Sequence, residues 1–296
     1  MKKKFHCFFI RKVPLQHQKN DLVKLFGTGD DLLTLSLLHF NKIHVTFAFH
    51  MVMQTTSSQL KILAIDIGGS HVKATVLDKN GKMLSDYIKT DTPSPANPDN
   101  IIKAIKELTR GLSFDRVSLG FPGYVRNNIV GTAPNLDDKA WRGYALGKQL
   151  EEELGKPTRV VNDADMQGLG IASGKGLEMV VTLGTGFGTA LVLDGMLLPH
   201  LEIAHHPITK TKDYDAYMGD KELDKIGKKK WNLRMKRVFK TLKTVFNYDH
   251  LYIGGGNSRL LTIKLDDNMS IVSNKDGIKG GARLWANEAK TRALKK

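Results

Sequence analysis

Three glycine-rich stretches could bring backbone amides close to a phosphate group. They are Asp66-Ile-Gly-Gly-Ser70, Gly184-Thr-Gly-Phe-Gly188 and Gly254-Gly-Gly-Asn-Ser258. Because glycine has no Cβ, consecutive N–H groups can converge on one anionic oxygen. Each stretch could also be a plain hairpin turn, and the first alone does not decide between the two interpretations. The recurrence of the pattern in both halves of the chain favours phosphate binding.

Charged and hydroxyl side chains accompany the first stretch. Asp66 ends an apolar run and could hold Mg²⁺ through water, while Ser70 and Lys73 could donate to phosphate oxygens. The second stretch would fit a dinucleotide site only if a helix followed the glycines directly. Residues 190–193 instead continue as a strand, so that site is excluded.

A carboxylate at a strand end could act as a general base. Asp163 follows Asn162, where a predicted strand ends and a predicted helix starts. It could accept the proton of a sugar hydroxyl, or it could only be the helix N-cap. Asp165 is expected to face solvent or to cap the same turn. Glu202 and His205 could hydrogen-bond sugar hydroxyls, although this pair is a weak signal by itself.

The elements that would position these residues alternate between strands and helices. Apolar runs predict strands at 61–66, 71–77, 116–120, 158–162, 179–183 and 251–253, and amphipathic patterns predict helices at 100–112, 146–154 and 164–172. Such alternation is typical of an α/β protein. A strand, a glycine turn and a second strand open each half of the chain, so we expect a domain boundary near residue 160.

The first 58 residues differ from the rest of the chain. Their apolar runs are broken by polar residues and show no period of 2 or 3.6. We predict an irregular, disordered extension here, with a targeting segment and a helical appendage as the alternatives. No run of about 18 uninterrupted apolar residues occurs anywhere in the chain, so no membrane span is expected.

The overall charge is strongly basic. The 296-residue chain has a formal net charge of +15, which favours nucleic acid, an acidic membrane surface or a phosphate-rich substrate as a partner. Cys7 is the single cysteine, so neither an internal disulfide nor a cysteine-based zinc site can form. This cysteine usage fits a cytoplasmic protein.

Part of the basic charge is concentrated between Lys225 and Lys243, where no acidic residue occurs. Apolar residues at helical spacing predict one packed face, formed by Trp231, Met235, Val238, Leu242 and Val245. The basic face is either simply solvated or a track for a polyanion. The scarcity of exposed aromatics argues against single-stranded nucleic acid, whereas inorganic polyphosphate needs only charge. The candidate track residues are Lys228, Lys229, Lys230, Arg234 and Arg237.

From about residue 61 to 285 the chain resembles the ROK (repressor, ORF, kinase) sugar kinases. The matching stretches, in order along the chain, are IDIGGSHVK, GFPG, PNLDDKAW, VVNDAD, LGTGFGTALVLDG, EIAHH and IGGGNS. This resemblance implies an α/β, actin-like ATPase (ribonuclease H-like) fold with two domains and a central cleft. We expect the domains at 59–160 and 161–296, the second containing the basic helix.

The resemblance also implies a role for individual residues. Asp163 corresponds to the catalytic base of the family. The implied sugar contacts are Gly123, Asn135, Asn162, Glu202 and His205, together with Asp163 itself. The implied phosphate contacts are Gly68, Gly69, Ser70, Thr185, Gly186, Gly255 and Gly256, to which the residues themselves add Asp66 and Lys73.

Two departures from the family narrow the expected function. The chain lacks the cysteine-rich zinc motif that many members carry after the sugar-binding histidine, so no zinc is expected. Residues 1–58 also show no two-helix pattern typical of the family's repressors. The short, zinc-less form resembles the polyphosphate glucokinases. We therefore expect a Mg²⁺-dependent cytoplasmic glucokinase that uses inorganic polyphosphate, and also ATP, to phosphorylate the 6-hydroxyl of glucose, with no nucleic acid or membrane partner.

Three alternatives remain at this point: a strictly ATP-dependent hexokinase, a non-catalytic sugar-binding protein, and a sugar-responsive transcription factor. The presence of Asp163 and the lack of a DNA-binding pattern speak against the last. The sequence leaves open the preferred donor, which hexose is bound, and whether the chain forms a homodimer.

Overall fold

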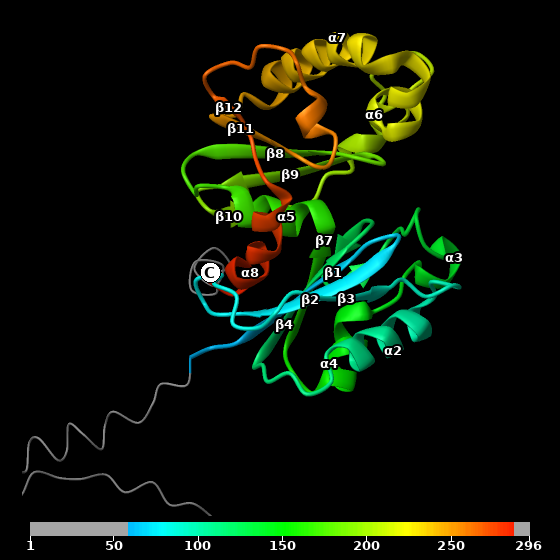
Figure 1. Ribbon diagram of the computed structural model, residues 1–296, viewed down its shortest axis with the longest axis vertical. Helices are drawn as coiled ribbons and strands as arrows, with labels where there is room; N and C mark the ends of the chain where they lie inside the picture. Colours follow the sequence, from blue (N-terminus) through cyan, green and yellow to red (C-terminus); the bar gives the residue numbers. More distant parts are fainter. Residues whose placement is uncertain (1–58, 287–296) are drawn as a thin grey trace, which may run out of the picture. The chain divides into compact units, whose positions relative to one another are not determined.

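The computed structural model describes residues 59–286, apart from the side chains of 274–276. The extension predicted for residues 1–58 lies outside the described residues. Two five-stranded sheets dominate the described part, and helices pack on both sheets (Figure 1). The predicted α/β class is therefore confirmed.

The first sheet has the strand order β3-β2-β1-β4-β7. β2 runs antiparallel to β1, and β4 and β7 run parallel to it. Their bounds are β1 (Ile62–Ile67), β2 (His71–Leu77), β3 (Ile88–Asp91), β4 (Arg116–Phe121) and β7 (Thr158–Asn162). β1 is apolar on both faces because both faces are covered. Leu63 and Ile65 belong to one core with helices α2 (Pro98–Leu108) and α4 (Leu146–Leu154), whereas Ile62 and Ala64 belong to another.

The second sheet has the strand order β10-β9-β8-β11-β12. Its strands are β8 (Leu177–Leu183), β9 (Phe187–Leu193), β10 (Met196–Leu197), β11 (His250–Gly254) and β12 (Met269–Ile271). Helices α6 (Tyr214–Met218) and α7 (Asp220–Phe246) share a core with β8 and β11. We call each sheet with its own helices a lobe.

Short elements complete the described chain. They are the hairpin β5 (Val125–Arg126) and β6 (Ile129–Val130), helix α3 (Asp138–Trp141), the 3₁₀ turns η2 (Ile203–His205), η3 (Ser258–Leu260) and η4 (Asn274–Lys279), and helix α8 (Gly280–Ala286). No helix among residues 59–286 combines the length and apolar character that crossing a bilayer requires.

Helix α5 (Asp163–Ile171) lies between the two sheets (Figure 1). Met166 packs with Ile62 and Ala64 of the first sheet, and Leu169 packs with Val192 of the second. At Gly168 an added Cβ would lie 2.6 Å from the Cβ of Ala190, so the helix touches β9 where it has no side chain. Helix α5, which begins at Asp163, thus packs against both sheets.

Helix α8 returns to the first lobe after the second sheet is complete. Ser118 of β4 donates a hydrogen bond to the carbonyl of Gly281 (2.6 Å) and accepts one from Trp285 (2.8 Å). The guanidinium groups of Arg116 and Arg159 lie 4.6 and 4.1 Å from the Trp285 ring. The predicted division placed all of 161–296 in the second domain, whereas this helix packs on the first sheet.

The basic helix differs from its prediction in two respects. Gly227 has non-helical angles (φ 74°, ψ 159°), so α7 is kinked there. Trp231, Met235 and Val238 are buried as expected, but Val245 is 62% exposed and does not belong to the packed face.

Candidate functional site

The N-terminus of α5 holds Asp163 in a fixed position. Asn162, not Asp163, is the N-cap: its Oδ1 accepts from the N–H groups of Ala164 (2.8 Å) and Asp165 (3.3 Å). The Asn162 Nδ2 donates to the carbonyl of Gly123 (3.0 Å). The capping role that was the alternative for Asp163 is therefore filled by its neighbour, and Asp163 is the first helical residue.

The environment of Asp163 suits a general base. Burial raises the pKa of its carboxyl from 3.8 to about 7, and the negative charges of Asp66 and Asp165 act in the same direction. The N–H of Ala164, which donates to Oδ1 at 2.8 Å, and the charge of His200 partly oppose this rise. A base with a pKa near 7 combines a large ionised fraction at neutral pH with good proton affinity.

Asp66 stands at the end of β1 next to a small cavity. Its carboxylate lies 3.5 Å from the ammonium of Lys73, and burial raises its pKa against the effect of that lysine. Asp66 and Lys73 line a pocket of about 430 Å³ together with Tyr87 and with Met166 and Gln167 of α5. The first glycine hairpin and the helix of the base thus share one pocket.

The tip of this hairpin is partly tied to its own lobe. The N–H of Gly68 donates to the carbonyl of His71 (2.9 Å), and the hydroxyl of Thr92 donates to the carbonyl of Gly68 (2.6 Å). The Gly68 amide is therefore already engaged, in contrast to the predicted nest of free amides. Gly69 and Ser70 are exposed and remain the phosphate contacts that this hairpin can offer.

The second and third glycine stretches pack against each other. Gly255 has φ +87°, and an added Cβ would lie 2.1 Å from the carbonyl oxygen of Leu183, so only glycine fits there. The N–H of Asn257 donates to the same carbonyl (3.0 Å). Thr185, Gly186, Gly255 and Gly256 therefore belong to one surface of the second lobe.

A carboxylate supports the second stretch. Asp215 Oδ1 accepts a hydrogen bond from the N–H of Phe187 (2.6 Å), and an added Cβ on Gly186 would lie 2.9 Å from the same oxygen. The Phe187 amide is consequently satisfied within the protein, and the loop is held in one shape.

Glu202, a predicted sugar contact, pairs with His200, a histidine that the sequence did not single out. His200 lies 3.5 Å from Glu202 and 3.0 Å from Asp165. Asp165 is buried, so the expectation that it faces solvent or caps the turn was wrong. The i, i+2 spacing of His200 and Glu202 could have pointed to this pair, because alternate residues of an extended segment share a side.

Two further predicted sugar contacts are less enclosed. The side chain of His205 is 54% exposed and lies 3.6 Å from Asp213. Asn135 is exposed in the turn before α3. Gly123 is sterically required, because an added Cβ would lie 2.0 Å from the carbonyl oxygen of Thr132.

A second cavity of about 580 Å³ adjoins Glu202. Tyr124 and Thr132 of the first lobe line it together with His200 and Glu202, and Val245 of α7 also belongs to the lining. The cavity therefore lies between the two lobes, next to the segment that carries the predicted sugar contacts.

The candidate polyphosphate track is only partly available. Arg234 donates to Glu222 (2.7 Å) and to the carbonyl of Tyr217 (3.1 Å), and its guanidinium stacks 4.3 Å from the Tyr217 ring. It therefore joins α6 to α7, which corrects its assignment to a free track. Arg237 donates to the carbonyl of Ile208 (3.2 Å) but stays exposed. Lys228, Lys229 and Lys230 are exposed at the start of the straight part of α7.

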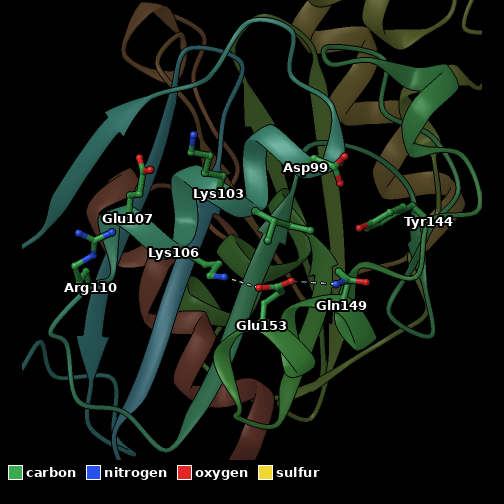
Figure 2. Close-up of a pocket in the computed structure, with 9 residues that line it drawn as sticks. Asp99, Lys103, Lys106, Glu107, Arg110, Tyr144, Gln149 and Glu153 are labelled. Carbon is green, nitrogen blue, oxygen red and sulfur yellow. Dashed lines mark hydrogen bonds and ion pairs between the residues drawn. The ribbon is translucent and has the colours of Figure 1, made fainter.

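A further pocket lies on the outer helices of the first lobe, away from these residues. Figure 2 shows it between α2 and α4, with a volume of about 470 Å³. Lys106 pairs with Glu153 at 2.6 Å. Because basic and acidic side chains line the pocket in equal number, it has no preference for an anion. The basic ones are Lys103, Lys106 and Arg110, and the acidic ones are Asp99, Glu107 and Glu153.

Known proteins resemble this chain in sequence and in fold. The profile of the ROK family matches residues 62–204. The polyphosphate glucokinase of Mycobacterium tuberculosis (strain CDC 1551 / Oshkosh) is 34% identical over 222 residues, which cover 71% of this chain and 82% of that protein.

Two solved structures extend the comparison. The inorganic polyphosphate/ATP-glucomannokinase of Arthrobacter sp. strain KM superposes with a TM-score of 0.66 at 29% identity, covering 80% of this chain and 100% of that one. A ROK family glucokinase from Streptomyces griseus, in complex with glucose and AMPPNP, has a TM-score of 0.59 at 21% identity, with 76% and 98% covered. The predicted actin-like ATPase fold with two domains is thereby confirmed.

Proposed function

Because the chain belongs to the ROK family, we propose that it is a cytoplasmic glucokinase that transfers a phosphoryl group from inorganic polyphosphate, and also from ATP, to the 6-hydroxyl of glucose. The observation that carries this proposal is Asp163, a partly buried carboxyl whose pKa is raised to about 7, at the start of a helix that contacts both sheets. The names of the relatives support both the sugar and the two donors.

In this proposal Asp163 takes the proton of the sugar hydroxyl as that oxygen attacks the terminal phosphoryl group. Asn162 keeps the base in place, since both ends of its amide are already bonded to Ala164, Asp165 and Gly123. The proposed role of Asn162 is therefore to support the site rather than to contact the sugar. Glu202 and His205 hold the sugar hydroxyls.

The donor's phosphates would lie between the first hairpin and the joined second and third stretches. Gly69, Ser70 and Lys73 would contact them from the first lobe, and Thr185 and Gly256 from the second. The exposed lysines at 228–230 would attract a long polyanion by charge.

Asp66 fits the requirements of Mg²⁺. No group of three or more His, Cys, Asp or Glu side chains within residues 59–286 could hold a metal ion alone. Mg²⁺ in kinases, however, is held by one or two carboxylates together with phosphates and water. The carboxylate of Asp66 beside the pocket fits that role, and the ion would neutralise charge on the phosphoryl group.

The test is an assay of the purified protein with glucose and either polyphosphate or ATP, with glucose 6-phosphate as the product measured. Product formation from polyphosphate is the expected result. Product from ATP alone would favour the strictly ATP-dependent alternative, and tight glucose binding without any product would favour a non-catalytic sugar-binding protein.

A further inference from the structure

We infer that His200 is a positioning residue that holds Glu202 against the sugar by tying it to Asp165 on the helix of the catalytic base. This inference rests on the proposed function. It concerns His200 and Asp165, neither of which is among the residues assigned above to the sugar or to the phosphates.

The geometry places His200 between two carboxylates. Its Nδ1 lies 3.0 Å from Asp165 Oδ1, and its Nε2 lies 3.5 Å from Glu202 Oε1. The shorter contact is an ion pair whose angles depart from those of a hydrogen bond. A carboxylate within about 4 Å of each ring nitrogen favours the positively charged imidazolium over the neutral imidazole.

The electrostatics agree with a cationic His200. Burial alone would lower its pKa, but its contacts with Asp165 and Glu202 outweigh burial and raise the pKa to about 9. The same imidazolium lowers the pKa of Glu202. One positive charge between two carboxylates relieves much of the cost of enclosing them.

The three charged side chains differ in how far they are exposed to solvent. The side chains of Asp165 and His200 are 4% and 6% exposed, whereas that of Glu202 is 31% exposed and lines the cavity of about 580 Å³. A ligand can therefore reach Glu202, whereas Asp165 lies outside the cavity lining and His200 exposes only 6% of its side chain at the cavity wall. His200 acts on the sugar through Glu202.

The anchor at the other end is rigid. The N–H of Asp165 is bound by the Asn162 side chain (3.3 Å), the same cap that fixes Asp163. The segment that carries Glu202 is a loop with a single 3₁₀ turn. The link through His200 thus fixes the distance between a sugar-binding carboxylate and the helix of the base, so that the hydroxyl to be phosphorylated meets Asp163.

The experiment compares His200→Ala, His200→Gln, Asp165→Asn and the double variant His200→Ala/Asp165→Asn with the wild type. The measurements are kcat and KM for glucose at saturating donor, KM for the donor, and the Kd for glucose without donor. His250→Ala is the matched control, since His250 is a part-buried histidine of the second lobe bonded to Ser270 (2.9 Å).

We expect His200→Ala to raise KM and Kd for glucose about tenfold or more, because it removes the charged partner that positions a sugar-binding carboxylate. The donor KM should stay within about twofold of the wild type, and the double variant should be little worse than the single ones, because the two residues act as one unit. His200→Gln, which can still donate to one carboxylate, should be intermediate.

An unchanged glucose Kd in a folded His200→Ala or His200→Gln protein would overturn the inference, and so would equal losses for glucose and for the donor. If His200→Ala does not fold, His200→Gln and Asp165→Asn decide the matter by the same measurements. A wild-type protein that neither binds nor phosphorylates glucose contradicts the proposed function itself, which the wild-type measurement reveals separately.

Discussion

At the scale of the residue, the raised pKa of Asp163 is the feature with the most direct consequence for activity. The base must be ionised to accept a proton, and its pKa is about 7. We therefore expect kcat/KM for glucose to fall about tenfold for each pH unit below this value. The measurement is a pH–rate profile between pH 5 and 8.5, and a flat profile across pH 6–8 would contradict the assignment.

The same pKa makes a prediction about stability. The folded-state pKa lies above the usual value of 3.8, so the folded protein holds this proton more tightly than the unfolded chain does. The stabilisation is complete below pH 3.8 and is lost as the pH rises through about 7. Asp163→Asn stays neutral, so its melting temperature relative to the wild type should rise between pH 4 and pH 7 and then level off. A difference that does not vary with pH would show that the pKa of Asp163 is not raised in the folded protein.

Residues differ in how well the sequence predicted them. Asp163, Asp66 and Glu202 could be selected because their types and neighbours recur as motifs. The contact between Asp165 and His200 could not be predicted, because the two residues are 35 positions apart and meet only when α5 packs beside the loop after β10. A charged residue in a helical first turn is usually exposed, and only tertiary packing reverses that expectation here.

At the scale of the element, local patterns predicted some bounds very closely. Strands at 71–77 and 158–162 and the helix at 146–154 have the predicted ends. Gly155, with φ +64°, ends that helix as a left-handed C-cap. Two side chains of α7 are exceptions: Arg234 pairs with Glu222, and Val245 is 62% exposed.

The basic helix makes a testable prediction about the donor. Lys228, Lys229 and Lys230 are exposed, so reversing their charge should leave the fold intact and weaken attraction to long polyphosphate. We expect the triple Lys→Glu variant to raise KM for polyphosphate severalfold, with KM for glucose and for ATP unchanged. The effect should shrink at high ionic strength, because exposed charges are screened over about 8–10 Å.

A control for general effects of charge reversal comes from the outer pocket of the first lobe. Lys103→Glu/Arg110→Glu changes exposed basic residues (Figure 2) that lie apart from the site. This variant should leave KM for polyphosphate unchanged. Equal losses in both variants, or equal losses for both donors, would show that the helix charge has no specific role.

Helix α8 makes a prediction about stability. Trp285 packs between Arg116 and Arg159 and donates to Ser118. Trp285→Ala should therefore lower the free energy of unfolding by about 3–5 kcal/mol. Leu233→Ala is the control, since Leu233 is 59% exposed and its loss should cost within about 0.5 kcal/mol. Denaturant unfolding measures both, and a Trp285→Ala protein as stable as the control would mean that α8 contributes little to the first lobe.

At the scale of the whole molecule, the proposed site draws its residues from both lobes. The first lobe supplies Asp66 and the first hairpin, the second supplies Glu202 and the joined glycine stretches, and α5 brings Asp163 between them. The family resemblance implied the two-domain fold, and the repeated strand–turn–strand units suggested a boundary near residue 160. The sequence did not predict that the chain returns to the first sheet at α8, because a short apolar helix carries no signal of which sheet it will cover.

We propose that the site formed by the two lobes and α5 transfers a phosphoryl group to glucose, with Asp163 as the base. The most direct measurement is the rate of glucose 6-phosphate formation by the wild type and by Asp163→Asn, with glucose binding measured in parallel. We predict that the wild type forms product from polyphosphate, and that the variant binds glucose normally while its kcat falls about 10²–10⁴-fold. A variant that keeps more than about a third of the wild-type kcat, far above that range, or a wild type that forms no product from either donor, would contradict the account.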